Sequence, residues 1–591
     1  MDYVPVIRAT AAPLQVTALI GTTTIVLGFD LAGPIPADLL GFAVRRIDLA
    51  DRSEVWLKNP LKFARAPYAG YQVAGTDSRQ APFQQFHWID EGVQPDRVYR
   101  YTVATIAGTP EQPIQLASCD LTLRTALISA GELTLVFNRG TTATPAYRTQ
   151  FDTLPPTTQP PALRAAAAAY LSRGLREGLL EFLGAAAAGD RLDIAIYEFQ
   201  DDAVVTALVA ALDRGVTVRL IAHAKNDHAG QANAPFLQLL RRHATPALTI
   251  VERRQVPALS HNKVVVHTAQ GAPARVWCGS TNFTDQAFFR QTNGGITIAD
   301  PALAQTYAAY LDLLAADQPA AHIRSAVRAL TATQPPNVPR QAFFSPSDRA
   351  DLLDAAVAAI RTARDVVLIS CPFGLDQRLS DALAALDPPV LVYGILNTNQ
   401  QGDLAVINRD VRQHSLFVLP AWIARLNGQA YDASTGSGNQ IHVKSLVVDA
   451  WGADPTVLIG SANFSDESVF QNDENALLLC GDHWAAAVVA TEFLRIFEHY
   501  RFRDRLKALA DSYDTAPLPG QRGMLLGPAE ADEPVWLVPP EAVEDSAGLG
   551  ARVLGVTLDD LWLDERGAWR TPYLMEGHPK RRERTVFAAE T

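Results

Sequence analysis

The sequence lacks the features that mark several common protein classes. Its 591 residues carry 63 acidic and 51 basic side chains and a formal net charge of −12, so it does not have the basic excess of a general nucleic-acid binder. The negative net charge likewise gives no support for electrostatic docking on anionic membranes. No run reaches about 18 apolar residues, and the first residues show no signal-peptide pattern. We therefore expect a cytoplasmic protein, although export without a cleaved signal and a nuclease with a locally positive cleft are both compatible with this composition.

Cysteine is also scarce. The four cysteines are widely spread, with neither metal-ligand spacing nor a disulfide framework, and we predict buried free thiols at Cys119, Cys278, Cys371 and Cys480. No cluster of Asp, Glu and His has metal-site spacing, so we expect no metal ion and no other cofactor. Hydrophobic residues make up 48% of the chain, which predicts a globular protein long enough for three or four domains.

Residues 1–125 have the pattern of an all-β domain. Alternating runs are separated by turn-forming clusters at strand-and-turn spacing. The stretch 86–101 resembles the E–F corner of fibronectin type III domains, in which a tyrosine hydroxyl after a turn bonds back to the backbone, as Tyr99 is placed to do. The resemblance implies a β-sandwich that serves as a structural module or binds a protein partner. A different small β-domain is the alternative.

The rest of the chain predicts a duplicated α/β body. After a Pro-rich connector at 126–163, segments typical of strands and helices alternate, which indicates sheets with helices on their faces. We expect two halves, 164–335 and 336–514, that begin with helices at about 162–187 and 348–363. Residues 515–591 are expected to form a small extension that packs on this body through Trp536, Trp562 and Trp569. We interpret the basic run at 578–584 as a solvated end, with contact to nucleic acid or lipid headgroups as the alternative.

One set of residues occurs twice, 181 positions apart. The first copy is His261, Lys263 and the Gly-Ser-Thr-Asn at 279–282; the second is His442, Lys444 and the Gly-Ser-Ala-Asn at 460–463. In both copies the histidine and the asparagine are 21 positions apart. The chain has only seven lysines, so two of them in this register argue against coincidence. The repetition predicts two halves of one site.

The residue types suit phosphodiester chemistry. Lysine supplies a compact positive charge, and Ser and Asn supply donors to phosphate oxygens. A neutral imidazole can attack phosphorus and a protonated one can donate to the leaving oxygen, so two facing histidines can divide these roles without a metal. We predict as catalytic residues His261, Lys263, Ser280, Asn282, His442, Lys444, Ser461 and Asn463. Helix capping by the two asparagines is the purely structural alternative.

At these positions the chain resembles the phospholipase D superfamily, whose signature is His-x-Lys, four residues, Asp, and then Gly-Ser-x-Asn downstream. The resemblance covers roughly residues 165–510. It implies two packed α/β halves with both motifs at a shared cleft, a covalent phosphohistidine intermediate, independence of metal ions, and substrates that range from phospholipids to nucleic acids. A monomer would then contain the whole site.

The two copies differ in their acids. Asp449 fills the acidic position of the second motif, whereas Thr268 stands there in the first. Further downstream, Glu474 is the acid that in this family orients the histidine, and Asn293 occupies the matching position of the first copy. We predict supporting roles for Asp449, Glu474 and Asn293.

This difference bears on which histidine attacks. A carboxylate on the far ring nitrogen fixes the tautomer and stabilises an imidazolium. On the assumption that Glu474 serves the histidine of its own half, we predict that His442 attacks and His261 protonates. The family resemblance implies the reverse assignment. A third interpretation is that the missing acids mark a weakened enzyme.

Three functions are compatible with the sequence. Phospholipid headgroup hydrolysis is favoured by the acidic charge and by the apolar and aromatic content. A nuclease is the first alternative, because polar loops at 223–228 and 397–400 follow strands expected to end at the cleft. The second is a binding or recruitment protein with weakened catalysis, in which the N-terminal domain binds the partner.

Overall fold

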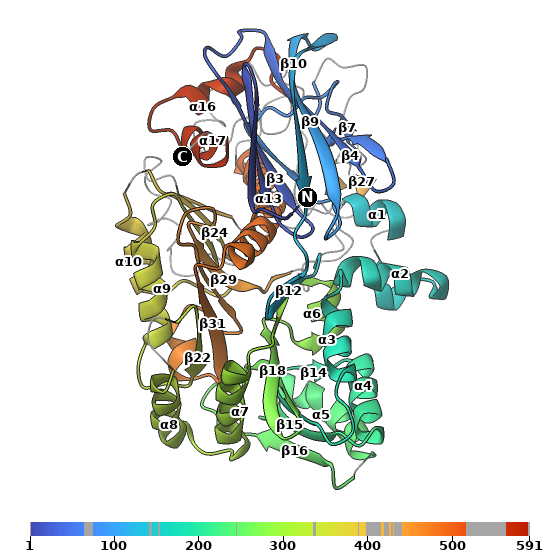
Figure 1. The fold of residues 1–591 in the computed structure, drawn as a ribbon, viewed down its shortest axis with the longest axis vertical. Helices are drawn as coiled ribbons and strands as arrows, with labels where there is room; N and C mark the ends of the chain where they lie inside the picture. Colours follow the sequence, from blue (N-terminus) through green and yellow to red (C-terminus); the bar gives the residue numbers. More distant parts are fainter. Residues whose placement is uncertain are drawn as a thin grey trace.

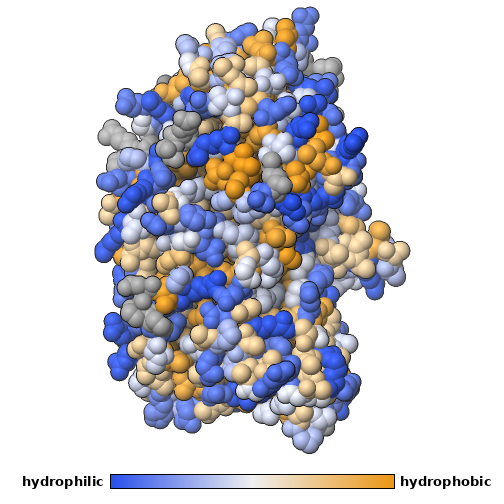
Figure 2. All heavy atoms as spheres, in the orientation of Figure 1, coloured by the Kyte–Doolittle hydropathy of each residue, from blue (hydrophilic) through white to orange (hydrophobic). Residues whose placement is uncertain are grey.

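The computed structural model describes residues 2–63, 75–140, 145–151, 154–243, 245–334, 338–387, 389–397, 415–418, 425–426, 429–430, 440–515 and 563–588. They form an N-terminal β-domain at one end of the molecule, two α/β halves side by side, and a C-terminal segment that returns to the β-domain (Figure 1). Among the described helices, none combines the length and apolarity needed to cross a membrane. On the face in Figure 2, hydrophilic and hydrophobic residues are interspersed.

The N-terminal domain consists of two four-stranded antiparallel sheets. One has the order β1 (Val6–Ala11), β2 (Leu14–Ile20), β3 (Ile25–Leu31), β8 (His87–Asp90); the other is β10 (Gln112–Arg124), β9 (Val98–Thr109), β4 (Leu39–Asp48), β5 (Glu54–Trp56). Apolar side chains of both sheets share one core, in which Leu27 and Phe42 are fully buried. The Tyr99 hydroxyl accepts a hydrogen bond from the Gln94 backbone N–H at 2.9 Å. The predicted tyrosine bond to the backbone is confirmed.

The two α/β halves have matching mixed sheets. The first has the order β11 (Ser129–Ala130), β12 (Leu133–Phe137), β21 (Gly294–Ile298), β18 (Ala272–Gly279), β17 (Lys263–Ala269), β13 (Arg191–Ile196), β15 (Thr217–His223), β16 (Leu248–Arg253). The second has the order β22 (Arg340–Ser345), β31 (Glu474–Cys480), β30 (Thr456–Gly460), β29 (Lys444–Val448), β23 (Val366–Ser370), β24 (Leu391–Ile395), β25 (Ser415–Val418). Apart from β11 the two orders correspond strand for strand, so the duplicated α/β architecture is confirmed.

Helices cover these sheets, and short strand pairs complete the loops. The helices are α1 (Pro145–Phe151), α2 (Pro161–Ser172), α3 (Leu175–Gly184), α4 (Asp202–Asp213), α5 (His228–Arg241), α6 (Asp285–Phe289), α7 (Pro301–Ala315), α8 (Ala320–Ala332), α9 (Asp351–Arg361), α10 (Gln377–Ala384), α12 (Asp466–Phe470), α13 (His483–Thr515), α16 (Thr571–Leu574) and α17 (Pro579–Ala588). The short pairs are β6 (Lys58–Asn59) with β7 (Thr76–Asp77), β14 (Phe199–Gln200) with β19 (Phe283–Thr284), β20 (Gln291–Thr292) with β28 (Gln440–Ile441), and β26 (Arg425–Leu426) with β27 (Gln429–Ala430). One hydrophobic core includes residues of both large sheets, of α7 and of α13.

Two boundaries differ from the sequence prediction. The segment 126–163 does more than connect, because β12 pairs with β21 as β22 pairs with β31. The first repeat therefore begins near Leu133. The helix expected at about 162–187 is divided into α2 and α3, since Arg173 and Gly174 both have left-handed backbone, with φ of 47° and 92°.

The C-terminal segment also departs from expectation. Trp569 packs on Phe86 of the N-terminal domain, with ring centroids 5.7 Å apart, and not on the α/β body. Helix α17 contacts both parts, because Arg584 pairs with Asp30 while Glu583 pairs with Arg501 of α13. The basic run is therefore not a solvated end. Trp536 and Trp562 lie outside the described residues, and Cys480, predicted to be buried, is exposed.

A buried charged cluster joins the three parts of the molecule. Glu492 of α13 pairs with Arg173 at 2.5 Å and with Arg495 at 2.9 Å, and it accepts hydrogen bonds from the hydroxyls of Thr23 and Thr24 in the N-terminal domain. Burial disfavours its charge, but the two guanidinium groups outweigh burial and lower the pKa of Glu492 to about 2. The carboxylate is therefore ionised in the folded protein at neutral pH.

Replacing Glu492 by glutamine is expected to destabilise the protein by about 3–5 kcal/mol, since two buried guanidinium groups lose their counter-charge. Because the folded pKa lies below the unfolded one, this stabilisation is present above pH ~4.3 and is lost as the pH falls toward 2. Urea unfolding at several pH values measures both effects. The exposed Glu111→Gln is the matched control, and equal unfolding midpoints for the two variants would contradict the assigned role.

Candidate active site

The two motifs converge because of where they lie in the matched sheets. Lys263 begins β17 and Lys444 begins β29, while Gly279 and Gly460 end the neighbouring strands β18 and β30. Gly279 has a φ of +140°, and a Cβ there would lie 2.3 Å from the Gly294 carbonyl oxygen, so the close strand approach requires glycine. The two motifs meet at the boundary of the halves.

Backbone pairing between the halves fixes both histidines. The His261 N–H donates to the Asp473 carbonyl at 2.9 Å, and the His442 N–H donates to the Thr292 carbonyl at 3.1 Å. Asp473 and Thr292 lie at the offset of 181, so these contacts repeat across the pseudo-two-fold axis. The imidazole rings lie 6.3 Å apart between centroids, and both side chains are buried. The structure therefore brings the two motifs together at one place.

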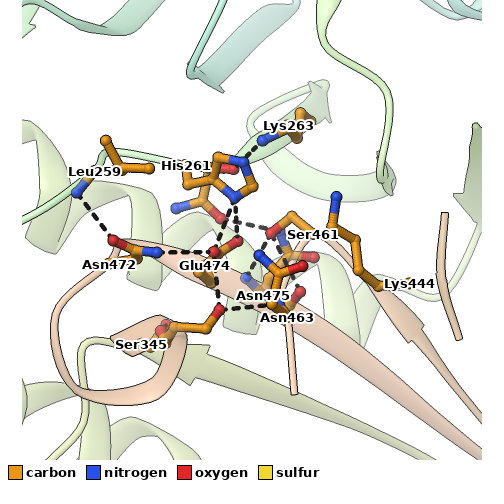
Figure 3. Close-up of polar contacts among 12 residues, drawn as sticks. Leu259, His261, Lys263, Ser345, Lys444, Ser461, Asn463, Asn472, Glu474 and Asn475 are labelled. Carbon is orange, nitrogen blue, oxygen red and sulfur yellow. Dashed lines mark hydrogen bonds and ion pairs between the residues drawn. The ribbon is translucent and has the colours of Figure 1, made fainter. Parts of the chain in front are cut away.

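Glu474 contacts the histidine of the other half. Its two carboxylate oxygens lie 2.8 and 2.9 Å from Nδ1 of His261, and Oε1 also accepts from the Ser468 hydroxyl at 2.9 Å and from Asn472 Nδ2 at 3.3 Å (Figure 3). With Glu474 ionised, Nδ1 of His261 carries the proton and Nε2 presents its lone pair. Glu474 therefore does not support His442, and our assumption about its partner was wrong.

His442 has a neutral environment on its Nδ1 side. The nitrogen lies 2.9 Å from the Ser280 backbone oxygen and 2.9 Å from Oδ1 of Asn293. Both atoms accept, so Nδ1 carries the proton here as well. The partners of Nδ1 in His442 are thus neutral dipoles, whereas the partner of Nδ1 in His261 is the carboxylate of Glu474. Stabilisation of a charged, phosphorylated ring therefore favours His261 as the nucleophile and not His442, because Glu474 and Asn293 each contact the histidine of the opposite half.

Burial opposes charge throughout the site. It lowers the pKa of His261 and of His442 well below the usual range, with the two lysines as the next cause. It raises the pKa of Glu474 to about 7 and lowers that of Lys263 to about 7. Burial, and then the neighbouring Lys263, lower the pKa of Lys444 well below its usual range. An arriving anionic group would favour the charged ammonium forms again.

The two lysines have equivalent settings. Nζ of each donates to the backbone oxygen of its own motif histidine, at 2.5 Å for Lys263 and 2.7 Å for Lys444. Each also lies 5.2 Å from the centre of an aromatic ring, Tyr197 in the first half and Phe373 in the second. Phe373 is 43% exposed and its ring packs edge-on against His442. One aromatic ring from each half therefore flanks the site.

The serine hydroxyls position other residues. Ser280 donates to Oδ1 of Asn293 at 2.8 Å. Ser461 donates to the Asn475 carbonyl at 3.3 Å (Figure 3). Each also accepts from a backbone N–H, of Gly294 or Asn475. We predicted donors directed at phosphate oxygens, but in this structure both hydroxyls form hydrogen bonds with neighbouring residues of the protein.

Asp449 does not reach the histidines. Its carboxylate accepts hydrogen bonds from the backbone N–H groups of residues 364–366, where β23 begins. In the first half Asp190, which precedes β13, has the reciprocal role, because it contacts His267 of β17 at 2.9 Å and the Gln270 N–H at 3.2 Å. The first half therefore has a carboxylate at this place although Thr268 is not an acid. The carboxylate belongs to Asp190 next to β13, whereas in the second half Asp449 follows β29, the strand equivalent to β17.

Sequence reasoning missed two features of the site. Glu198, between β13 and β14, accepts a hydrogen bond from Nδ2 of Asn282, so this amide donor is occupied. Arg253, fully buried at the end of β16, forms a bidentate pair with Asp473 at 3.0 and 3.2 Å, beside Glu474. Neither residue belongs to the repeated motif. Their contacts with the site become visible only when the chain is folded.

The predicted polar loop at 223–228 is held by its own contacts. Lys225 donates to the backbone oxygens of Pro257 and Ala258 at 2.9 and 3.0 Å. His223 is fully buried and pairs with Asp227, which caps α5 through the Gly230 N–H. In the second loop Asn397 bonds to the backbone of Ile441, and residues 398–400 lie outside the described part.

Comparison with known proteins agrees with this architecture. The family model described as "Cardiolipin synthase, PLD-like domain" matches the chain twice, at residues 179–314 and 356–500, once in each half. No curated protein matches the chain. Together the folded duplication and the paired His–Lys motifs define a two-half phospholipase D-like protein. The duplicated α/β body of the chain belongs to the phospholipase D superfamily.

Some solved structures are similar to parts of the chain at low sequence identity. Phosphatidylserine synthase from Haemophilus influenzae is 14% identical over 56% of this chain and 85% of its own, with a TM-score of 0.38. Nuc from Salmonella typhimurium, a phospholipase D family member, is 20% identical over 28% and 94%, with a TM-score of 0.21. Polyphosphate kinase from Porphyromonas gingivalis is 12% identical over 52% and 43%, with a TM-score of 0.36, so the chain covers less than half of that protein.

Proposed function

We propose that this protein is a metal-independent phosphodiesterase that hydrolyses the headgroup ester of a phospholipid through a phosphohistidine on His261. The observation that carries the proposal is the facing pair of imidazoles, each held at Nδ1 by the opposite half. Among the described residues neither Nε2 atom has a hydrogen-bond partner. A phosphorus atom between the rings would have a nucleophile on one side and a proton donor on the other.

The reaction then proceeds in two displacements. Nε2 of His261 forms a bond to phosphorus while the bond from phosphorus to the leaving alcohol breaks, and protonated His442 transfers its Nε2 proton to the leaving oxygen. Neutral His442 next accepts a proton from water, whose oxygen attacks phosphorus and breaks the P–N bond. The phosphate monoester leaves with the incoming oxygen, and both histidines return to their starting states.

The surrounding charges suit this assignment. Phosphorylation of His261 leaves its ring with a positive charge, which Glu474 stabilises at 2.8 Å. Nδ1 of His442 contacts an amide and a carbonyl oxygen in place of a carboxylate, so its imidazolium is less stabilised and gives up a proton readily. Lys263 and Lys444 supply positive charge for the phosphate oxygens. The asymmetry of the motifs thus separates the roles of nucleophile and proton donor.

Two observations support a phospholipid as the substrate. The exposed Phe373 beside His442 and Lys444 provides an apolar contact at the site. Positive charge for a nucleic-acid backbone is scarce, because Lys225, the one lysine of the 223–228 loop, donates to backbone carbonyls and the chain carries a net charge of −12.

We further propose that the N-terminal domain is fibronectin type III-like and binds a protein partner.

A substrate panel tests the proposal. Purified protein with a chelator is offered phospholipid vesicles, single-stranded DNA and bis-p-nitrophenyl phosphate. We expect phosphate monoester release from the vesicles and the small diester, and none from His261→Ala/His442→Ala. Preferred cleavage of DNA would replace the phospholipid by a nucleic acid, and turnover retained in the double variant would refute the mechanism.

The pH dependence follows from three groups. Activity should rise as Glu474, with a pKa of about 7, ionises. It should fall as Lys263, also near 7, loses its charge and as His442, whose pKa is lowered by burial, loses the proton that it donates. We expect a narrow bell for kcat/KM with its maximum at or below about pH 7, and a kcat profile whose alkaline limb lies higher, because the bound anion stabilises the charged lysine and imidazolium. Initial rates across a buffer series measure this. A flat profile from about pH 5 to 9 would contradict these assignments.

A further inference from the structure

Glu198 is a carboxylate where a phosphodiester enzyme has no evident need for one. It follows β13 and Tyr197, whose ring lies 5.0 Å from that of His261, and its side chain is half-buried. It lies within electrostatic range of both Lys263 and Lys444. The matching segment of the second half, after β23, is Cys-Pro-Phe at 371–373 and contains no acid. The feature is confined to one side of the site.

This part of the site has acceptors without donors. Oε2 of Glu198 accepts from Nδ2 of Asn282, but Oε1 has no hydrogen-bond partner among the described residues. Oδ1 of the same Asn282 is buried and lacks a partner there, as does Oδ1 of the equivalent Asn463 in the second half. A buried amide oxygen without a donor is costly unless a ligand or water supplies one, and only in the first half does a carboxylate adjoin it. Two adjoining acceptors fit a group with several N–H donors.

From these observations, and on the basis of the function proposed above, we infer that Glu198 selects the substrate by its headgroup: its carboxylate binds a primary ammonium attached to the scissile phosphodiester. A primary ammonium has three donors, which suits Oε1 of Glu198 and Oδ1 of Asn282 together. A quaternary ammonium has none, and a glycerol hydroxyl brings no charge. Glu198 is thus a specificity-determining residue for a zwitterionic headgroup of the ethanolamine type.

The test is the ratio of kcat/KM for phosphatidylethanolamine to that for phosphatidylglycerol, in vesicles of matched acyl chains. In Glu198→Gln this ratio should fall about 10- to 100-fold, the size expected for loss of one charge-assisted hydrogen bond. Glu198→Asp should restore part of the preference, because it restores the charge. The exposed Glu111→Gln should leave the ratio unchanged.

The outcomes separate this inference from the proposed function. Wild-type protein active on lipids, with a ratio that Glu198→Gln leaves unchanged, would overturn the role of Glu198 alone. An equal loss on both lipids would also overturn it, since Glu198 would then merely position Asn282. Wild-type protein inactive on both lipids would overturn the proposed function and this inference with it.

Discussion

His261→Ala is expected to lower kcat by about 10⁴- to 10⁶-fold, because the side chain that forms the covalent bond is lost. The ring is buried, its Nδ1 is held by Glu474 and its backbone N–H by Asp473, so the substitution removes a nucleophile that the fold holds in position. Single-turnover and steady-state rates on bis-p-nitrophenyl phosphate measure the loss. His322→Ala on the exposed face of α8 is the matched control and should retain activity.

Trapping distinguishes the two histidines. With His442→Asn the proton donor and later base is absent, so a phosphoenzyme formed from an activated diester should accumulate. Acid-labile label mapped by mass spectrometry to the peptide that contains His261 would establish the nucleophile. Label on His442 in the wild-type protein would refute the assignment and support the prediction from the sequence that His442 attacks and His261 protonates.

Much of the architecture could be predicted from the sequence, because the repeat is exact in spacing. The offset of 181 positions and the alternation of strands and helices indicated two matching α/β halves. β12 escaped prediction because a five-residue strand next to a Pro-rich segment has no local pattern of its own, and only its pairing with β21 identifies it. The division between α2 and α3 depends on the backbone of Arg173 and Gly174, which helical periodicity does not show.

The composition of the site was predictable, but its connectivity was not. Spacing along the chain placed His442 and Glu474 in one half, and proximity in sequence suggested that they are partners. In the structure each histidine loop pairs with the opposite half, so Glu474 contacts His261 and Asn293 contacts His442. Such exchange across a two-fold axis leaves every spacing in the sequence unchanged. A single sequence therefore cannot show it.

Glu474→Gln tests the role of the contact between Glu474 and His261 of the opposite half. The amide can occupy the place of the carboxylate, as Asn293 does beside His442, but it cannot stabilise a charged phosphohistidine. We expect kcat to fall about 10³- to 10⁴-fold, with KM changed much less, because the lost interaction belongs to the transition state and the intermediate. Steady-state kinetics on the small diester separate the two parameters.

Stability provides the control for this variant. Burial raises the pKa of Glu474 to about 7, above its unfolded value of ~4.3, so the folded state binds the extra proton and ionisation costs stability as the pH rises through that window. Glutamine carries no such cost, and at pH 8 Glu474→Gln should unfold at the same urea concentration as the wild type or a higher one. A folded but inactive variant would locate the effect in the chemistry. A fall in the unfolding midpoint that parallels the loss of rate would instead make Glu474 a structural residue, and the division of roles between the two histidines would lose its physical basis.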